Sequence, residues 1–474
     1  MRKSHLKHYG VSQENLDEAQ AATTSAEATA AGTSPEVEVV AVDPQPVVTE
    51  LEPGADGLEA ALVALNEGTT EAEENEGAVA NASDVIEKLE VATEKLLPVI
   101  IQNGGLDRNG AAILSWALEG LYERVGMPST SRGLAAESFG SVMEKVEATQ
   151  LSMEEVKNAS SEIWTKLVEL WEKAIAHIAA LWLKFWDTAT KLKGRADKVA
   201  GTAGTIKGNA KSKTIPAKNF GQLLAMNGKV EPKAVSQVLL NMAKELGASM
   251  ETTKNEAAKM LEGLTSGKTE TLKYALPAGF SAVDPAKVGM PQPEEGMAIY
   301  SSGKERPGNK TLVIVAPAEV ASATPADLAK TAARMASFDT SRKPNGELQV
   351  TVLSPADLAK TAQVLSQVAD GLLAYKSIQA EIDKIRKEAL AKAKSMISEG
   401  NANGALTDMA KACMAIASQF GPITAAYLAN AATATIQLVE TSMLEYGVEN
   451  TAAKPAPMPA EKPAEKPAEE KPAE

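Results

Sequence analysis

The stretch from residue 162 to residue 186, EIWTKLVELWEKAIAHIAALWLKFW, decides the fold class of this 474-residue chain. It contains four of the five tryptophans, which alternate with Val168, Ile175 and Ile178 at steps of three and four residues. This spacing places them on one face of an α-helix. The tryptophans of this stripe are Trp164, Trp171, Trp182 and Trp186. The pattern predicts a long amphipathic helix with a wide apolar face.

Three roles are open for this tryptophan stripe. It can be the core face of a helix that packs against neighbouring helices. It can be a protein–protein assembly surface, because tryptophan is frequent at the energetic centres of interfaces. It can also lie in a membrane interface, since Trp and Lys flank a short apolar centre. His177 lies on the adjacent apolar stripe, where we expect a packed histidine rather than a metal ligand.

Sequence signals on both sides of the stretch set the expected length of the helix. Ser152 and Glu155 fit a capping box, so we expect the helix to begin there and to run to about Lys198. A glycine-containing basic segment follows, and we expect a flexible linker over residues 200–220. The glycines do not have the spacing of a nucleotide-binding loop.

Residues 191–218 carry eight basic side chains and one Asp. The eight are Lys191, Lys193, Arg195, Lys198, Lys207, Lys211, Lys213 and Lys218. No aromatic residue is interspersed among them, so contact with double-stranded DNA would be electrostatic and independent of sequence. The alternative is a solvated linker without a ligand.

The rest of the chain predicts a mainly α protein with a small β insertion, that is, an α+β fold with long helices. Strands are expected at residues 297–301, 310–316 and 348–353. Helices are expected near 232–246, 251–262, 354–397, 406–419 and 422–446. The nine residues 324–332, TPADLAKTA, recur at 354–362 as SPADLAKTA, and each copy has the features of a helix start.

Charge divides the chain into an acidic leader and a balanced body. Residues 1–137 hold 24 acidic and 8 basic groups, a net of −16, whereas the remainder holds 38 and 40, a net of +2. We expect these segments: 1–82 disordered acidic arm, 83–137 helical part of the leader, 138–199 tryptophan-rich helix, 200–220 basic linker, 221–275 small helical domain, 276–353 β-containing domain, 354–450 C-terminal helical domain and 451–474 disordered Pro/Ala/Glu/Lys tail.

The sequence does not predict catalysis. It contains one cysteine and three histidines and lacks the nucleophile-elbow, zinc-protease and EF-hand motifs. We therefore predict no enzyme activity and no catalytic, cofactor-binding or metal-binding residues. Cys413 lies on an apolar helical stripe and is expected in the core. The longest apolar run of the sequence, of about ten residues, is too short for a membrane-spanning helix.

Three runs of sequence resemble a known family. They are GGLDRNGAA at 104–112, AAESFG at 135–140 and EATQLSME at 147–154, followed by the tryptophan-rich helix. This part resembles the internal head, or prohead core, proteins of large tailed bacteriophages of the jumbo-phage type. The resemblance implies a virion protein made in the host cytoplasm and packaged in the capsid interior, and it leaves ejection with the DNA open. It implies as partners the phage prohead protease, other capsid-interior proteins and packaged double-stranded DNA bound non-specifically.

The resemblance also implies removal of a propeptide during capsid maturation. Proteases of such phages favour a small residue, any residue and Glu, and cut after the Glu. Matches end at Glu27, Glu74, Glu137 and Glu154. A cut between Glu137 and Ser138 would separate the acidic leader from the balanced body, so we predict processing there. Two alternatives stay open: an ejected membrane-active protein that uses the tryptophan stripe, and a cytoplasmic helical adaptor unrelated to phages.

Overall fold

The computed structural model describes residues 55–91, 102, 117, 119–125, 127, 142–217, 220–267, 273–339, 348–399 and 404–447, with the backbone alone for 142–160. The chain divides into two units, Met1–Glu52 and Pro53–Glu474, and the described residues all belong to the second. Most of the predicted acidic arm and the whole C-terminal tail lie outside the described residues.

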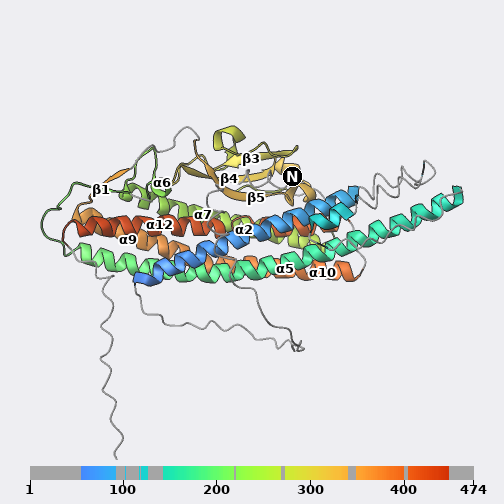
Figure 1. The fold of residues 1–474 in the computed structure, drawn as a ribbon, viewed down its shortest axis with the longest axis horizontal. Helices are drawn as coiled ribbons and strands as arrows, with labels where there is room; N and C mark the ends of the chain where they lie inside the picture. Colours follow the sequence, from blue (N-terminus) through green and yellow to red (C-terminus); the bar gives the residue numbers. More distant parts are fainter. Residues whose placement is uncertain are drawn as a thin grey trace, which may run out of the picture. The chain divides into compact units, whose positions relative to one another are not determined.

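Long helices dominate the described part, which confirms the predicted mainly α fold. They are α2 (Ala55–Val91), α5 (Val142–Ala203), α7 (Pro232–Ser266), α9 (Pro355–Leu373), α10 (Tyr375–Ser398), α11 (Gly404–Ser418) and α12 (Pro422–Leu444), and a short helix, α6 (Phe220–Leu224), precedes α7. Figure 1 shows the longer helices side by side, with α5 in contact with α2, α9, α10 and α12. One hydrophobic core joins residues from most of the predicted segments, so the structure does not separate these segments into independent domains.

Helix α12 lies in the interior of this bundle and is apolar on most sides, as expected of a helix surrounded by others. The stretch Gly404–Leu444 is long and apolar enough to span a membrane by composition. However, 78 % of its most apolar window is buried inside the protein, as expected for a pair of core helices.

Four strands form an antiparallel sheet in the order β2-β3-β4-β5, which confirms the small β insertion. The strands are β2 (Ser281–Ala282), β3 (Met297–Ser301), β4 (Lys310–Pro317) and β5 (Ala332–Ser337). Tyr300 pairs with Ile314, and Ile314 pairs with Ala333. The predicted third strand exists as β6 (Gln349–Thr351), but it pairs with β1 (Thr214–Pro216) rather than with this sheet.

Three predictions of helix extent were wrong. The helix expected over 354–397 is two helices, α9 and α10, which are separated at Ala374. Helix α5 begins at Val142, ten residues before the predicted capping box, because no glycine or proline interrupts residues 142–151. Helix α7 is continuous where two helices were predicted, and Gly247 lies within it. A Cβ at Gly247 would stand 3.2 Å from the Tyr375 ring, so this glycine permits close packing between α7 and α10 instead of ending a helix.

The predicted disorder of residues 1–82 was wrong for 55–82, which form most of helix α2. The buried side chains of α2 include Leu58, Leu65, Val85 and Ile86. They pack into the hydrophobic core that α5 dominates. Tertiary burial, rather than intrinsic helix propensity, therefore stabilises this acidic segment as a helix.

Candidate functional site

Helix α2 runs antiparallel to α5 along its tryptophan-rich part. The Glu59 carboxylate lies 3.6 Å from Arg195, the Gly68 carbonyl lies 3.0 Å from Nε2 of His177, and Tyr122, beyond the end of α2, donates to Glu162. The residue numbers thus rise along α2 while those of its contacts on α5 fall. Figure 1 shows the two helices crossing the same stretch of the molecule.

The tryptophan stripe lies in the core. Trp164, Trp171 and Trp182 are 2 %, 3 % and 2 % exposed, and Trp186 is half-buried against the core. Trp182 stacks on Trp186 with 4.9 Å between ring centroids, and Trp164 meets Trp171 edge-on at 5.4 Å. Of the three roles considered for this stripe, its burial supports the core role. The first three indoles are covered in the folded chain, so they do not form an open surface for a membrane or a partner protein.

The two helices approach closely at Gly68. A Cβ at this position would stand 2.7 Å from Cδ1 of Leu181 and 3.5 Å from Nζ of Lys184. Absence of a side chain lets the α2 backbone approach α5, and the same Gly68 carbonyl hydrogen-bonds the His177 ring. His177 is therefore bound within the helix pair, which agrees with its expected role as a packed residue.

Two lysines in the C-terminal part of α5, Lys191 and Lys193, are paired with carboxylates. Lys191 lies 2.6 Å from Asp187, one turn earlier on the same helix. Lys193 lies 2.7 Å from Asp370 on α9. These contacts neutralise part of the positive charge that the sequence concentrates here.

Arg195 faces the interior of the protein, which contradicts its predicted contact with DNA phosphate. Its Nε donates to Glu440 at 2.7 Å, Nη2 donates to the other carboxylate oxygen, and the side chain is 13 % exposed. Burial alone would lower the pKa of Arg195, but Glu440 and the charge of Glu59 raise it above its ordinary value. The guanidinium is thus committed to carboxylates on α12 and α2.

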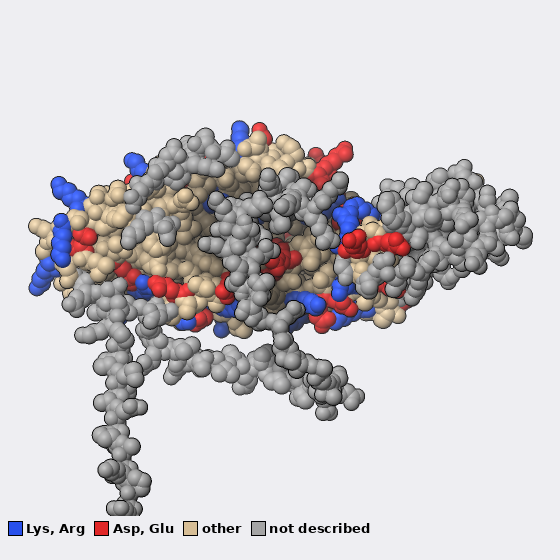
Figure 2. Space-filling model, viewed as in Figure 1, with Lys and Arg blue, Asp and Glu red and all other residues tan. Residues whose placement is uncertain are grey.

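The remaining described lysines of the basic segment are exposed. They are Lys198, Lys207, Lys211 and Lys213, and none forms an ion pair with a carboxylate in the described part of the chain. Figure 2 shows Lys and Arg side chains at the end of the molecule that carries β1 and the end of α5. Lys218 lies outside the described residues.

The connection after α5, where a flexible linker was predicted, is tied to the body at Lys211 and Lys213. The Lys211 amide donates to the Glu445 carbonyl at 2.8 Å, and the Val352 amide donates to the Lys213 carbonyl at 2.9 Å. Strand β1 then pairs with β6. These backbone hydrogen bonds hold the exposed lysines at a defined place on the surface.

Within the described residues, no group of three or more His, Cys, Asp and Glu side chains is placed to bind a metal ion. Cys413 is fully buried, which confirms its expected place in the core. Burial raises the pKa of its thiol to about 12, so the reactive thiolate is scarce at neutral pH.

The predicted processing site, Glu137 and Ser138, lies outside the described residues. Two of the other matching sites fall within helices: Glu74 in α2 and Glu154 in α5. A helical backbone cannot adopt the extended conformation in which a protease binds its substrate without unfolding locally.

Residues 60–441 match the family of phiKZ-like phage internal head proteins. The chain belongs to this family. The match confirms the resemblance to internal head proteins and excludes an adaptor unrelated to phages. It places the protein inside the virion capsid, in association with other components of the capsid interior. Neither the curated proteins nor the solved structures compared with the chain gave a match.

The family match begins in α2 and ends in α12. It therefore includes most of α2, which lies in the acidic leader, as well as the body beyond Glu137. This extent agrees with the packing of α2 and α5 into one core.

Proposed function

We propose that this internal head protein is a non-enzymatic structural component that contacts packaged DNA through the exposed lysines at the end of α5. The observation that carries the proposal is the division of the basic segment into two parts. Lys191, Lys193 and Arg195 are paired with carboxylates, whereas Lys198 and the lysines of the connection are exposed. Lysines that are exposed and have no carboxylate partner in the described part of the chain can attract phosphate groups.

Such contact is independent of DNA sequence because it consists of ammonium groups near phosphates. Each phosphate contact releases counterions, so four contacts give a slope of log affinity against log salt of about −3.6. Packaged DNA presents phosphates at very high density, so weak individual contacts suffice inside a capsid.

The test is a triple variant, Lys207→Gln, Lys211→Gln and Lys213→Gln, titrated with duplex DNA by fluorescence anisotropy over a range of salt. We expect the salt slope to become shallower by about 2.7. The matched control replaces Lys376, Lys384 and Lys387, three exposed lysines on α10, and thus makes the same change in net charge. Equal losses in the two variants would contradict a specific role for the connection.

The proposal includes one cut by the phage prohead protease, between Glu137 and Ser138. Helical structure at Glu74 and Glu154 disfavours two of the four matching sites, which leaves Glu27 and Glu137. Of these, only the cut after Glu137 divides the chain into parts with net charges of −16 and +2.

Mass spectrometry of purified particles tests both the packaging of the protein and the cut after Glu137. We expect a body fragment whose N-terminus is Ser138. Absence of the protein from particles would contradict packaging, and an intact chain or a different N-terminus would contradict this cut. Ejection with the DNA and action on a membrane would require the tryptophan stripe to lose its cover, and a blue shift of tryptophan emission with anionic vesicles would reveal that.

A further inference from the structure

We infer that residues 55–91 stay bound to the body after the chain is cut, so that α2 becomes part of a second, non-covalently held chain of the mature protein. This inference rests on the proposed cut after Glu137. It replaces a discarded leader by a retained one and assigns the stripe of α5 beside the tryptophans, which carries His177 and Leu181, as its binding surface.

The first support is the apolar surface shared by the two helices. Leu65 and Val85 are fully buried in the core, and Leu58 and Ile86 nearly so. On α5, Leu181 lies against Gly68 of α2 and is 1 % exposed. Release of α2 would return these apolar surfaces to water, which the hydrophobic effect opposes. The cut itself exposes none of them, because Glu137 is 46 residues beyond Val91.

The second support is a series of polar contacts along the whole length of α2. Near its beginning, Glu59 meets Arg195 on α5 and accepts a hydrogen bond from Gln437 on α12 at 3.0 Å. In its first half, Asn430 on α12 donates to Asn66 at 2.7 Å, and His177 meets the Gly68 carbonyl. These contacts fix the register of α2 against two helices of the body.

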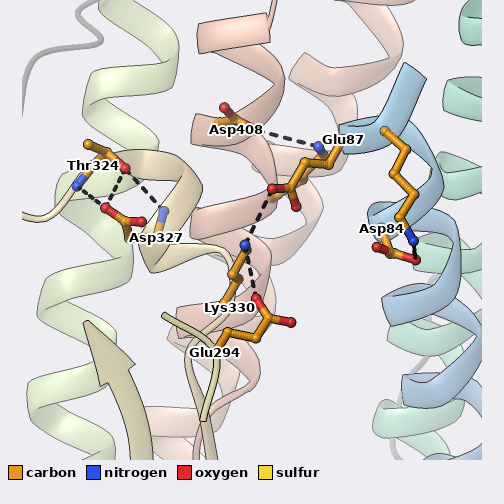
Figure 3. Close-up of polar contacts among 9 residues, drawn as sticks. Asp84, Glu87, Glu294, Thr324, Asp327, Lys330 and Asp408 are labelled. Atoms are coloured by element: carbon orange, nitrogen blue, oxygen red, sulfur yellow. Dashed lines mark hydrogen bonds and ion pairs between the residues drawn. The ribbon is translucent and has the colours of Figure 1, made fainter. Parts of the chain in front are cut away.

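A further contact holds the last turns of α2. Lys330, which follows the short helix α8 (Pro325–Leu328), lies 3.4 Å from Glu87 and 3.1 Å from Glu294 (Figure 3). Because contacts occur near both ends and in the first half, α2 is attached over its length rather than hinged at one end.

The third support is the buried guanidinium of Arg386, whose pKa is affected by a carboxylate of α2. Arg386 on α10 is 1 % exposed and donates to Asp383 at 2.8 Å and to the Ala417 carbonyl. Burial lowers the pKa of Arg386, while the charges of Asp383 and of Glu76 on α2 oppose this shift. Loss of α2 would take away one of the negative charges that favour this buried cation.

The experiment uses the full chain with the recognition sequence of a site-specific protease inserted between Glu137 and Ser138. After complete cleavage, gel filtration coupled to mass spectrometry measures whether the two fragments elute together. We expect an equimolar complex and unchanged tryptophan emission. Separation of the fragments in native buffer, with a red shift of the emission, would overturn the inference.

Two variants in α2 give matched controls. Leu65→Asp places a charge at a fully buried position and should release the fragment after cleavage. Val63→Asp makes a similar change at a side chain that is 57 % exposed and should leave the complex intact. If Leu65→Asp disturbs folding before the cut, the emission change on cleavage of the unmodified chain and of Val63→Asp still decides the question.

Purified particles separate failure of this inference from failure of the proposed function. Equal amounts of peptides from 55–91 and from the body, together with an N-terminus at Ser138, would support both. A cut body without peptides from 55–91 would overturn retention and leave the proposed function standing. An uncut chain would overturn the cut, while the engineered cleavage would still test whether α2 is held.

Discussion

Two stretches of helix α5 differ in what covers them. Residues 162–186 are covered by α2 and by helices of the body, so their indoles form part of the core. From Lys191 to Arg195 the basic side chains pair with carboxylates, whereas the side chain of Lys198 is exposed. One helix thus supplies both packing and a surface for phosphate. The difference is set by the side chains that each stretch presents to its partners, and for both stretches these partners include α2, a segment of the acidic leader.

The largest expected effect tests the covered stretch. Trp182→Ala should lower the free energy of unfolding by about 3–5 kcal/mol, because it removes a buried indole and leaves a cavity. Leu183→Ala, at a neighbouring side chain that is 69 % exposed, should change it by less than about 0.5 kcal/mol. Urea denaturation followed by circular dichroism measures both values. Similar losses for the two variants would contradict the burial of Trp182.

The tryptophan-rich helix could be predicted from sequence, but its cover could not. The stripe in α5 repeats large apolar residues at helical spacing, a signal that does not depend on other parts of the chain. In α2, by contrast, the chain has ten acidic residues and one basic residue, and several of its buried positions are alanines. Composition alone therefore predicts disorder, and contact with α5 and α12 supplies the missing stabilisation.

The repeated nine-residue segment shows the same limit at a smaller scale. Both copies cap a helix: the Asp327 amide donates to the Thr324 hydroxyl oxygen, and the Asp357 amide donates to that of Ser354. The first copy nevertheless ends after one turn as α8 and continues into strand β5, whereas the second begins the 19-residue helix α9. The residues after the copy, and the partners they pack against, decide how far the helix extends.

The basic segment was predictable as a source of positive charge, but not as a surface. Arg195 pairs with a carboxylate 245 positions away, and no local pattern indicates that partner. The exposed lysines at 207–213 could be identified from their glycine-rich surroundings, but the hydrogen bonds that fix their place involve residues near 352 and 445. Sequence thus predicts which charges are present, and the tertiary structure determines which of them remain exposed.

A smaller effect on stability is expected at Arg195, in the charged stretch of α5. Arg195→Met should lower the free energy of unfolding by about 3 kcal/mol, because it leaves Glu440 half-enclosed without its partner. Lys191→Met removes a more exposed pair on one helix and should cost about 0.5 kcal/mol or less. Restoration of stability by the double change Arg195→Met and Glu440→Gln would confirm that the loss comes from the unpaired carboxylate. Equal effects of Arg195→Met and Lys191→Met would show that the two pairs are equally solvated.

The smallest expected effect concerns salt. Lys193 meets Asp370 near the surface, with both side chains more than one third exposed, so this pair should contribute about 0.2–1 kcal/mol at low ionic strength. The difference in unfolding free energy between the unmodified chain and Lys193→Met should shrink as sodium chloride rises from about 50 mM to 1 M, because the Debye length falls to about 3 Å. The cost of Trp182→Ala should not shrink in this way, since salt does not screen apolar packing. A salt-insensitive cost for Lys193→Met would mean that the charged stretch of α5 is as enclosed as the tryptophan-rich stretch.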